Sequence, residues 1–116
     1  AFPNLQATVS YIQGRGLDVL VHCAGWKGRF NLEDSLYAGA LVKSLESTHQ
    51  SDEDGALAMK SLFEREGHQL KSYLSKASHA KRLQNHGIES DIDFCLTLDL
   101  YQDVVKVDDR GFLVRI

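Results

Sequence analysis

Apolar and polar residues recur along the chain with spacings that predict helices, one buried strand and a terminal hairpin. From Asn4 to about Gln13, apolar residues fall at every third or fourth position, as on one face of a helix that glycines then end. The next segment, Leu17 to Ala24, is almost continuously apolar or β-branched, which is typical of a strand buried on both faces in a parallel sheet. A helix followed by such a strand predicts an α/β fold.

The middle of the chain has the spacing of helices. Asn31 can cap a helix that runs to about Ser47, with an acidic residue three positions after the cap and an apolar stripe along one face. Ser51 and the acidic residues after it begin a second helical run. The region 52–87 is therefore predicted to be helical, with glycines separating its segments.

The last quarter of the chain carries a hairpin pattern. Residues 91–95 favour a short helical turn, and 96–100 fit either a helix or a strand. Residues 104–107 and 112–116 are rich in β-branched and apolar side chains, and they flank Asp-Asp-Arg-Gly at 108–111. The predicted architecture is a three-layer α/β/α domain with a mainly parallel sheet and a C-terminal β-hairpin.

Composition narrows the class of protein. The 116 residues, 43% of them apolar, suit one folded domain over 1–116. A formal net charge of −3 argues against a general nucleic-acid binder, which needs a basic surface. Neither a long apolar run nor a signal-peptide pattern occurs, so we expect no membrane association and a cytoplasmic location. Cys23 and Cys95 lack metal-site spacing and are interpreted as reduced, buried thiols.

A glycine-containing basic loop joins the predicted strand to the helix after Asn31. Strand, loop and helix start together gather free backbone N–H groups and the positive end of a helix dipole, which favours an anion site. Gly25 and Gly28 allow the backbone to approach a ligand, while Lys27 and Arg29 supply a point charge and a bidentate fork for phosphate or sulfonate oxygens.

Two carboxylates follow this loop in the first helical turn. Glu33 and Asp34 are hard oxygen ligands of the kind that Mg²⁺ takes, usually together with substrate phosphate. The alternative interpretation is structural, because any α/β turn can hold glycines and basic residues, and helix starts favour acidic residues. The loop matches neither the nucleotide P-loop nor the dinucleotide fingerprint.

Other candidate side chains have a structural interpretation beside the functional one. His22 lies in the predicted strand and is interpreted as a core or interface histidine. Cys23 ends that strand and is interpreted as a core residue, although a covalent role for the thiol stays open. Ser78 and Arg82 share a helical face and can approach a substrate with His79, but a helix cap and a surface arginine explain the same residues.

The loop and its flanks resemble a known signature. Residues 23–34 match the pattern C-A-G-x-x-G-R-F-x-L-E-D of the 2-phosphosulfolactate phosphatase family. Further matching segments are Ala38–Val42, Ser78–Leu83, Asp91-Ile92 and Phe94-Cys95. The resemblance covers nearly the whole chain, but only the C-terminal half of the family, whose earlier D-V-L-R-A-T-T-T-like segment has no counterpart here.

This resemblance implies a Mg²⁺-dependent phosphatase that converts 2-phospho-3-sulfolactate to 3-sulfolactate and phosphate in coenzyme M biosynthesis. It implies that Arg29 and Lys27 hold phosphate or sulfonate, that Gly25 and Gly28 shape the loop, and that Glu33 and Asp34 bind metal or orient water. The chain would be part of a two-domain parent fold, with the N-terminal half as its missing partner. A chain that starts without Met, directly at a helix entry, favours the same interpretation.

A second functional class fits the same loop. A non-catalytic anion-binding or assembly domain would bind phosphate or sulfonate at the helix N-terminus without metal dependence or turnover. An apolar face left bare in the isolated domain could also drive formation of a homo-oligomer.

Overall fold

Helices make up most of the secondary structure in the computed structural model, which describes residues 1–77 and 89–116. In chain order the elements are η1 (Phe2–Asn4), α1 (Leu5–Arg15), α2 (Leu32–Leu45), α3 (Asp54–Glu66), η2 (Gly67–Gln69), α4 (Leu70–Leu74), α6 (Glu89–Leu96), β1 (Val105–Val107) and β2 (Leu113–Arg115). The fold is α/β, and within the described ranges its sheet consists of β1 and β2, paired antiparallel. The expected parallel sheet does not form within these ranges.

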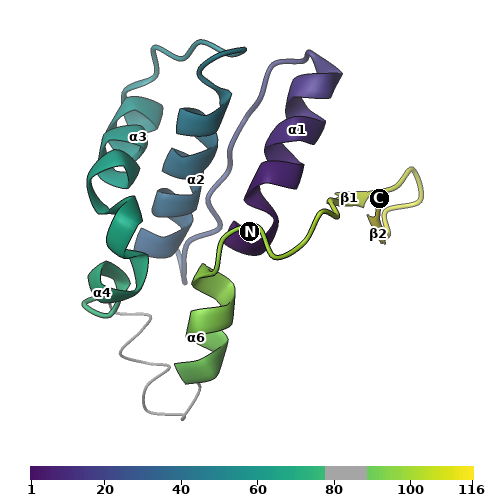
Figure 1. The fold of residues 1–116 in the computed structure, drawn as a ribbon. Coiled ribbons are helices and arrows are strands. Elements are labelled where there is room, and N and C mark those ends of the chain that lie inside the picture. The colour runs from purple at the N-terminus through teal and green to yellow at the C-terminus, as the bar shows by residue number, and fades with distance from the viewer. Residues whose placement is uncertain (78–88) are drawn as a thin grey trace.

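The core lies around α2, which packs between α1 and α3 (Figure 1). Leu36 and Ala40 of α2 are fully buried, and Val9 of α1 is 2% exposed. Gly39 allows the closest approach to α3, because a Cβ there would lie 2.0 Å from the backbone oxygen of Met59. The buried cluster comprises Phe2, Leu5, Val9, Leu36, Ala40, Leu41, Leu45, Leu70 and Leu74.

The segment predicted to be a buried strand, Leu17 to Ala24, is not buried. It runs between α1 and α2 without regular secondary structure (Figure 1), and Leu20 is 90% exposed. Val21 alone in this segment packs against the core cluster. The prediction of burial was wrong for this chain. An almost continuously apolar segment is buried only where other elements cover both of its faces, and the described residues do not cover both.

The predicted helix boundaries are largely confirmed, but the capping bonds are not. Asn31 takes the N-cap position of α2, yet its side chain makes no cap hydrogen bond and instead donates from Nδ2 to Glu33 Oε1 at 3.2 Å. Asn4, at the N-cap of α1, donates from Nδ2 to the carbonyl oxygen of Asp103 at 2.9 Å. Gly16 ends α1 in the left-handed conformation with φ of 60°, as predicted for a helix-ending glycine.

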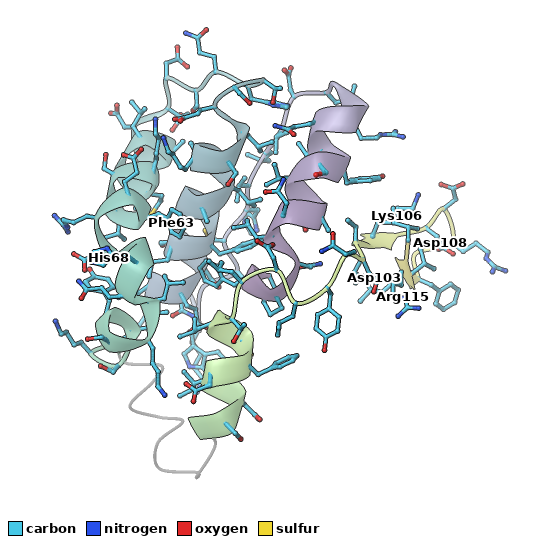
Figure 2. The ribbon with its side chains drawn as sticks, viewed as in Figure 1. Phe63, His68, Asp103, Lys106, Asp108 and Arg115 are labelled. Carbon is cyan, nitrogen blue, oxygen red and sulfur yellow. The ribbon has the colours of Figure 1, made fainter. Side chains whose placement is uncertain are left out.

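The predicted terminal hairpin is confirmed. Val105 pairs with Arg115 and Val107 with Leu113, and the turn contains Gly111 with φ of +84°. The carboxylate of Asp108 accepts hydrogen bonds from two backbone N–H groups in the turn, each 2.9 Å long. Figure 2 shows the charged side chains of this hairpin well away from the three long helices. The charged side chains of the hairpin therefore lie apart from the basic loop between α1 and α2.

The predicted helical region after residue 52 is confirmed where it is described. It divides into α3, η2 and α4, and the predicted turn near Asp91 belongs to α6. The rest of that prediction, residues 78–87, lies outside the described residues. Among the described helices, none has both the length and the apolar character needed to cross a membrane.

Candidate functional site

The basic loop is a tight two-residue turn. The N–H of Trp26 donates to the carbonyl oxygen of Arg29, and the N–H of Arg29 donates back to Trp26, both at 3.0 Å. The two central residues, Lys27 and Gly28, have positive φ values of 51° and 72°, as in a type I′ turn. Gly28 thus takes a left-handed conformation that favours glycine, in agreement with the loop-shaping role that the resemblance implies.

Asp34 holds this turn against the start of α2. Its Oδ2 accepts a hydrogen bond from the backbone N–H of Gly25 at 2.7 Å. Gly25 has φ of +67°, and a Cβ there would lie only 2.6 Å from the carbonyl oxygen of Arg29. Glycine is therefore required at this position by both conformation and space, and one oxygen of Asp34 serves a structural role.

Lys27 and Arg29 are carried outward by the turn. Both residues are exposed, and the ammonium of Lys27 lies 5.8 Å from the ring centroid of Trp26. At that distance the lysine makes a cation–π contact, which accounts for its position without a ligand. The two predicted cationic residues are therefore both exposed to solvent.

A pocket of about 610 Å³ is lined by the segment before the basic loop, by the start of α2 and by α6. Glu33 and Asp34 both line it, together with Tyr37 from the next turn of α2 and Asp91 from α6. The remaining described lining residues are Ala1, Phe2, Val21, His22, Cys23, Ala24, Leu74, Ile92, Cys95 and Leu96. The described lining includes the predicted carboxylates but not Gly25, Lys27, Gly28 or Arg29, so the carboxylates and the cations face different spaces.

Both cysteines line this pocket, and both are exposed rather than buried, which corrects the prediction of core thiols. Partial burial raises the pKa of the Cys23 thiol, and the negative charge of Asp34 raises it further. A thiol whose pKa is raised stays protonated near neutral pH, so the environment of Cys23 does not favour a covalent nucleophile. His22 is likewise exposed, so its interpretation as a core histidine was wrong, while its interpretation as an interface histidine stays a prediction.

Two acidic residues of α6 lie in different surroundings, and the candidates of the family-matching segment 78–83 are not described. Asp91 reaches the pocket, whereas the carboxylate of Asp93 lies 2.5 Å from the ammonium of Lys71 in an ion pair between α6 and α4. Ser78, His79 and Arg82 lie outside the described residues.

Tyr37 was not predicted to be part of the site. It is half-buried, its ring contacts Phe2 edge-on at 5.4 Å between centroids, and burial raises the pKa of its hydroxyl. A sequence signal existed, because Tyr37 follows Glu33 by four positions and Asp34 by three, which places all three side chains on one side of a helix. The helix was oriented by its apolar stripe, whose positions come one residue before Glu33 and Tyr37, so the pattern gave Tyr37 no functional role.

The donor groups suit an ion shared with a substrate better than a complete protein cage. Within residues 1–77 and 89–116, no group of three or more His, Cys, Asp or Glu side chains is arranged to hold a metal ion. The adjacent carboxylates of Glu33 and Asp34 are the predicted metal ligands. Mg²⁺ is commonly held by one or two carboxylates, with substrate phosphate completing its coordination.

Comparison with known proteins places these features in a family context. Residues 1–110 match the family profile described as 2-phosphosulpholactate phosphatase. The chain is 41% identical over 115 residues to a protein of Thermotoga maritima named "Probable 2-phosphosulfolactate phosphatase", covering 99% of this chain and 49% of the relative. A protein of Gloeobacter violaceus with the same name is 34% identical over 116 residues, covering 99% of this chain and 48% of the relative. The chain therefore spans about half the length of these relatives.

Proposed function

The chain belongs to the 2-phosphosulfolactate phosphatase family, and from this premise we propose that it forms one part of a cytoplasmic phosphatase acting on a small, multiply anionic phosphomonoester. The substrate proposed is 2-phospho-3-sulfolactate, which is hydrolysed to 3-sulfolactate and phosphate as a step of coenzyme M biosynthesis. The other part of the active site is proposed to come from the N-terminal half of a two-domain parent protein, which would complete the three-layer fold around a mainly parallel sheet.

One observation carries the proposal. The hydrogen bond from Gly25 N–H to Asp34 Oδ2 fixes the Trp26–Arg29 turn to the helix start that holds Glu33 and Asp34. Cationic and anionic groups are therefore held by one rigid unit, although they face different spaces in this chain. A phosphomonoester at the edge of this unit would meet cations for its oxyanions and carboxylates for a metal ion and a water molecule.

The carboxylates suit a Mg²⁺ ion. Asp34 uses Oδ2 for the backbone of Gly25, which leaves its Oδ1 as a ligand atom, and Glu33 borders the same pocket. Glu33 and Asp34 would hold the ion with substrate phosphate oxygens. A bound Mg²⁺ would neutralise charge that develops on the phosphoryl group.

The residues of this chain have separate tasks in the proposed reaction. Arg29 binds two oxygens of the phosphate or sulfonate group through its fork, and Lys27 adds a single charge once it leaves the ring of Trp26. Glu33 orients the attacking water and accepts its proton as the new P–O bond forms. The bond from phosphorus to the 2-oxygen breaks, and that oxygen takes a proton from solvent water to become the hydroxyl of 3-sulfolactate.

The test is phosphate release from 2-phospho-3-sulfolactate by a single polypeptide in which this chain follows the unmatched part of the Thermotoga maritima relative. Activity is expected to disappear with a chelator and to return with added Mg²⁺. Arg29→Ala and Glu33→Ala are each expected to lower kcat/KM by about 100-fold, because each removes a charged group from the transition state.

The matched control for Arg29 is Arg110→Ala. Arg110 has a side chain that is 83% exposed on the terminal hairpin, so its removal is expected to leave kcat/KM unchanged. Undiminished activity of Arg29→Ala and Glu33→Ala would overturn the assigned roles. Absence of phosphate release in a folded polypeptide would overturn the activity itself.

A non-catalytic anion-binding or assembly domain is the second candidate, because the exposed turn presents Lys27 and Arg29 to solvent even without the carboxylates. It predicts that the chain alone binds inorganic phosphate or sulfate with equal affinity in the presence and absence of Mg²⁺. Titration calorimetry distinguishes the two candidates, since the phosphatase requires turnover and metal dependence.

A further inference from the structure

An apolar segment without regular secondary structure runs between α1 and α2 at residues 17–24 (Figure 1). Within the described residues, none of its backbone N–H or C=O groups takes part in a backbone–backbone hydrogen bond. The carbonyl oxygen of Leu17 lies 3.2 Å from Nε2 of His49, which is a side-chain contact at one end. At about 3.3 Å per residue, these eight residues present about 26 Å of unpaired backbone.

The two sides of this segment differ. Neighbouring side chains of the segment differ in exposure, as expected where successive side chains point in different directions. Val21 packs against the helical core and Val19 is 39% exposed, whereas Leu20 is 90% exposed. The helices therefore contact the segment at Val21 and leave Leu20 bare.

A partner strand fits this surface better than a small molecule does. Unpaired N–H and C=O groups along an extended, β-branched segment are a template for strand addition, in which backbone hydrogen bonds provide affinity and alternate side chains provide specificity. The composition of the segment is that of a strand buried on both faces, which requires neighbours on both edges and a covering layer on the Leu20 side.

A second copy of this chain meets only part of that requirement. A two-fold dimer that paired residues 17–24 with themselves would add one antiparallel neighbour and leave the second edge unpaired. The curated relatives are about twice as long as this chain, so a protein of this family carries a further stretch of polypeptide of about the same length. That stretch is long enough to supply several strands and a covering layer.

We infer that residues 17–24 form an inner strand of a sheet whose other strands come from polypeptide equivalent to the unmatched half of the relatives. The same polypeptide covers Leu20. This inference rests on the parent protein of the proposed function, but not on its activity.

The test co-expresses a tagged form of this chain with the unmatched part of the Thermotoga maritima relative and follows amide hydrogen exchange by mass spectrometry. In the chain alone, amides 18–24 are expected to exchange without protection. In the co-purified complex their exchange is expected to slow by at least about 100-fold, as for a strand inside a sheet. Failure to form a complex, or a complex with amides 18–24 unprotected, would overturn the inference, as would their protection in a self-dimer of the chain alone.

A pair of variants tests the covered face. Leu20→Lys is expected to weaken the complex by at least about 10-fold, because a charge would be buried without a partner. Leu57→Lys is the matched control, since Leu57 is a 45% exposed leucine on α3 that faces solvent. Both variants change exposed side chains, so circular dichroism is expected to show both folded, and equal binding by both would contradict the inference.

Binding and turnover separate this inference from the proposed phosphatase. A complex with protected amides but without phosphate release would leave the interface standing and overturn the activity. Phosphate release by the single polypeptide with amides 18–24 unprotected would support the activity and overturn the proposed interface.

Discussion

Gly25 meets two requirements that other residues cannot meet together. Its φ of +67° lies in the left-handed region, and its Cα faces the carbonyl oxygen of Arg29 so closely that a Cβ would lie 2.6 Å away. Gly28 has a similar φ of +72°, but a Cβ there would meet nothing within 4 Å. Substitutions at Gly28 and Gly25 therefore separate the energetic cost of left-handed backbone from the added cost of steric overlap.

Gly28→Ala is expected to lower the free energy of unfolding by about 1–2 kcal/mol, the cost of left-handed backbone in a residue with a Cβ. Gly25→Ala is expected to lower it by at least about 1 kcal/mol more, because the turn must also shift away from the Arg29 oxygen. Urea denaturation of both variants measures the difference. Equal losses would show that the turn relaxes freely around Gly25.

The thiol of Cys23 provides a second test at the residue scale. Its pKa is raised by burial and then by Asp34, so the thiolate is expected to form only above the usual pKa of 9.0. In a Cys95→Ser variant, the rate of alkylation by iodoacetamide should rise with pH and reach half its maximum above pH 9.0. Asp34→Asn should lower that midpoint, and a midpoint below neutral pH would restore Cys23 as a nucleophile.

At the scale of elements, the contact between α2 and α3 depends on the absence of a side chain. Gly39 lies in α2 with helical backbone, and the position of a Cβ there falls 2.0 Å from the oxygen and 2.6 Å from the carbon of the Met59 carbonyl. Backbone of α3 cannot give way as a flexible side chain would, so a methyl group at Gly39 must separate the helices.

Gly39→Ala is expected to destabilise the fold by about 1–3 kcal/mol despite the better helix propensity of alanine. Gly14→Ala, in α1, is the control, because a Cβ there meets nothing within 4 Å and the substitution should stabilise by about 0.5–1 kcal/mol. Thermal unfolding should therefore shift in opposite directions for the two variants. A rise in the melting temperature of Gly39→Ala would show that α3 is loosely docked.

At the scale of the whole molecule, the start of the chain is joined to segments far along the sequence. The carbonyl oxygen of Phe2 accepts a hydrogen bond from the N–H of Asp99 at 3.0 Å, and that of Pro3 accepts one from Tyr101 at 2.8 Å. The ring of Phe2 contacts Tyr37 of α2 edge-on and stacks with Phe63 of α3 at 6.5 Å between centroids. Phe2 therefore connects three parts of the fold.

Phe2→Ala is expected to destabilise the chain by about 3–5 kcal/mol, a large share of the stability of a domain of this size. Phe2 is 5% exposed, whereas Phe94 is 49% exposed on α6, so Phe94→Ala is the control with a much smaller expected loss. Denaturant unfolding measures both. Similar losses would mean that the core does not centre on Phe2.

Local patterns in the sequence were sufficient for the features that depend on near neighbours. Helix spacing predicted α1 and α2 near their observed bounds, and α3 and α6 lie where a helical region and a helical turn were predicted. A glycine between two β-branched runs predicted the terminal hairpin. The glycines of the basic loop were assigned to its shape, and the observed positive φ of Gly25 and Gly28 agrees. These features follow from backbone preference and from periodicity, both of which are written in short stretches of chain.

Tertiary structure decided the features that depend on distant partners. The sequence allowed Asp34 to bind metal or to stabilise the helix start, and only the fold showed that Oδ2 accepts a hydrogen bond from the N–H of Gly25. Apolar residues 17–24 predicted a buried strand, but burial requires neighbouring strands, and Leu20 is 90% exposed in this chain. The sequence by itself thus determined the elements, the turn and the family signature, while the tertiary structure decided which side chains meet and which surfaces stay bare, because contacts between distant residues are not encoded in local spacing.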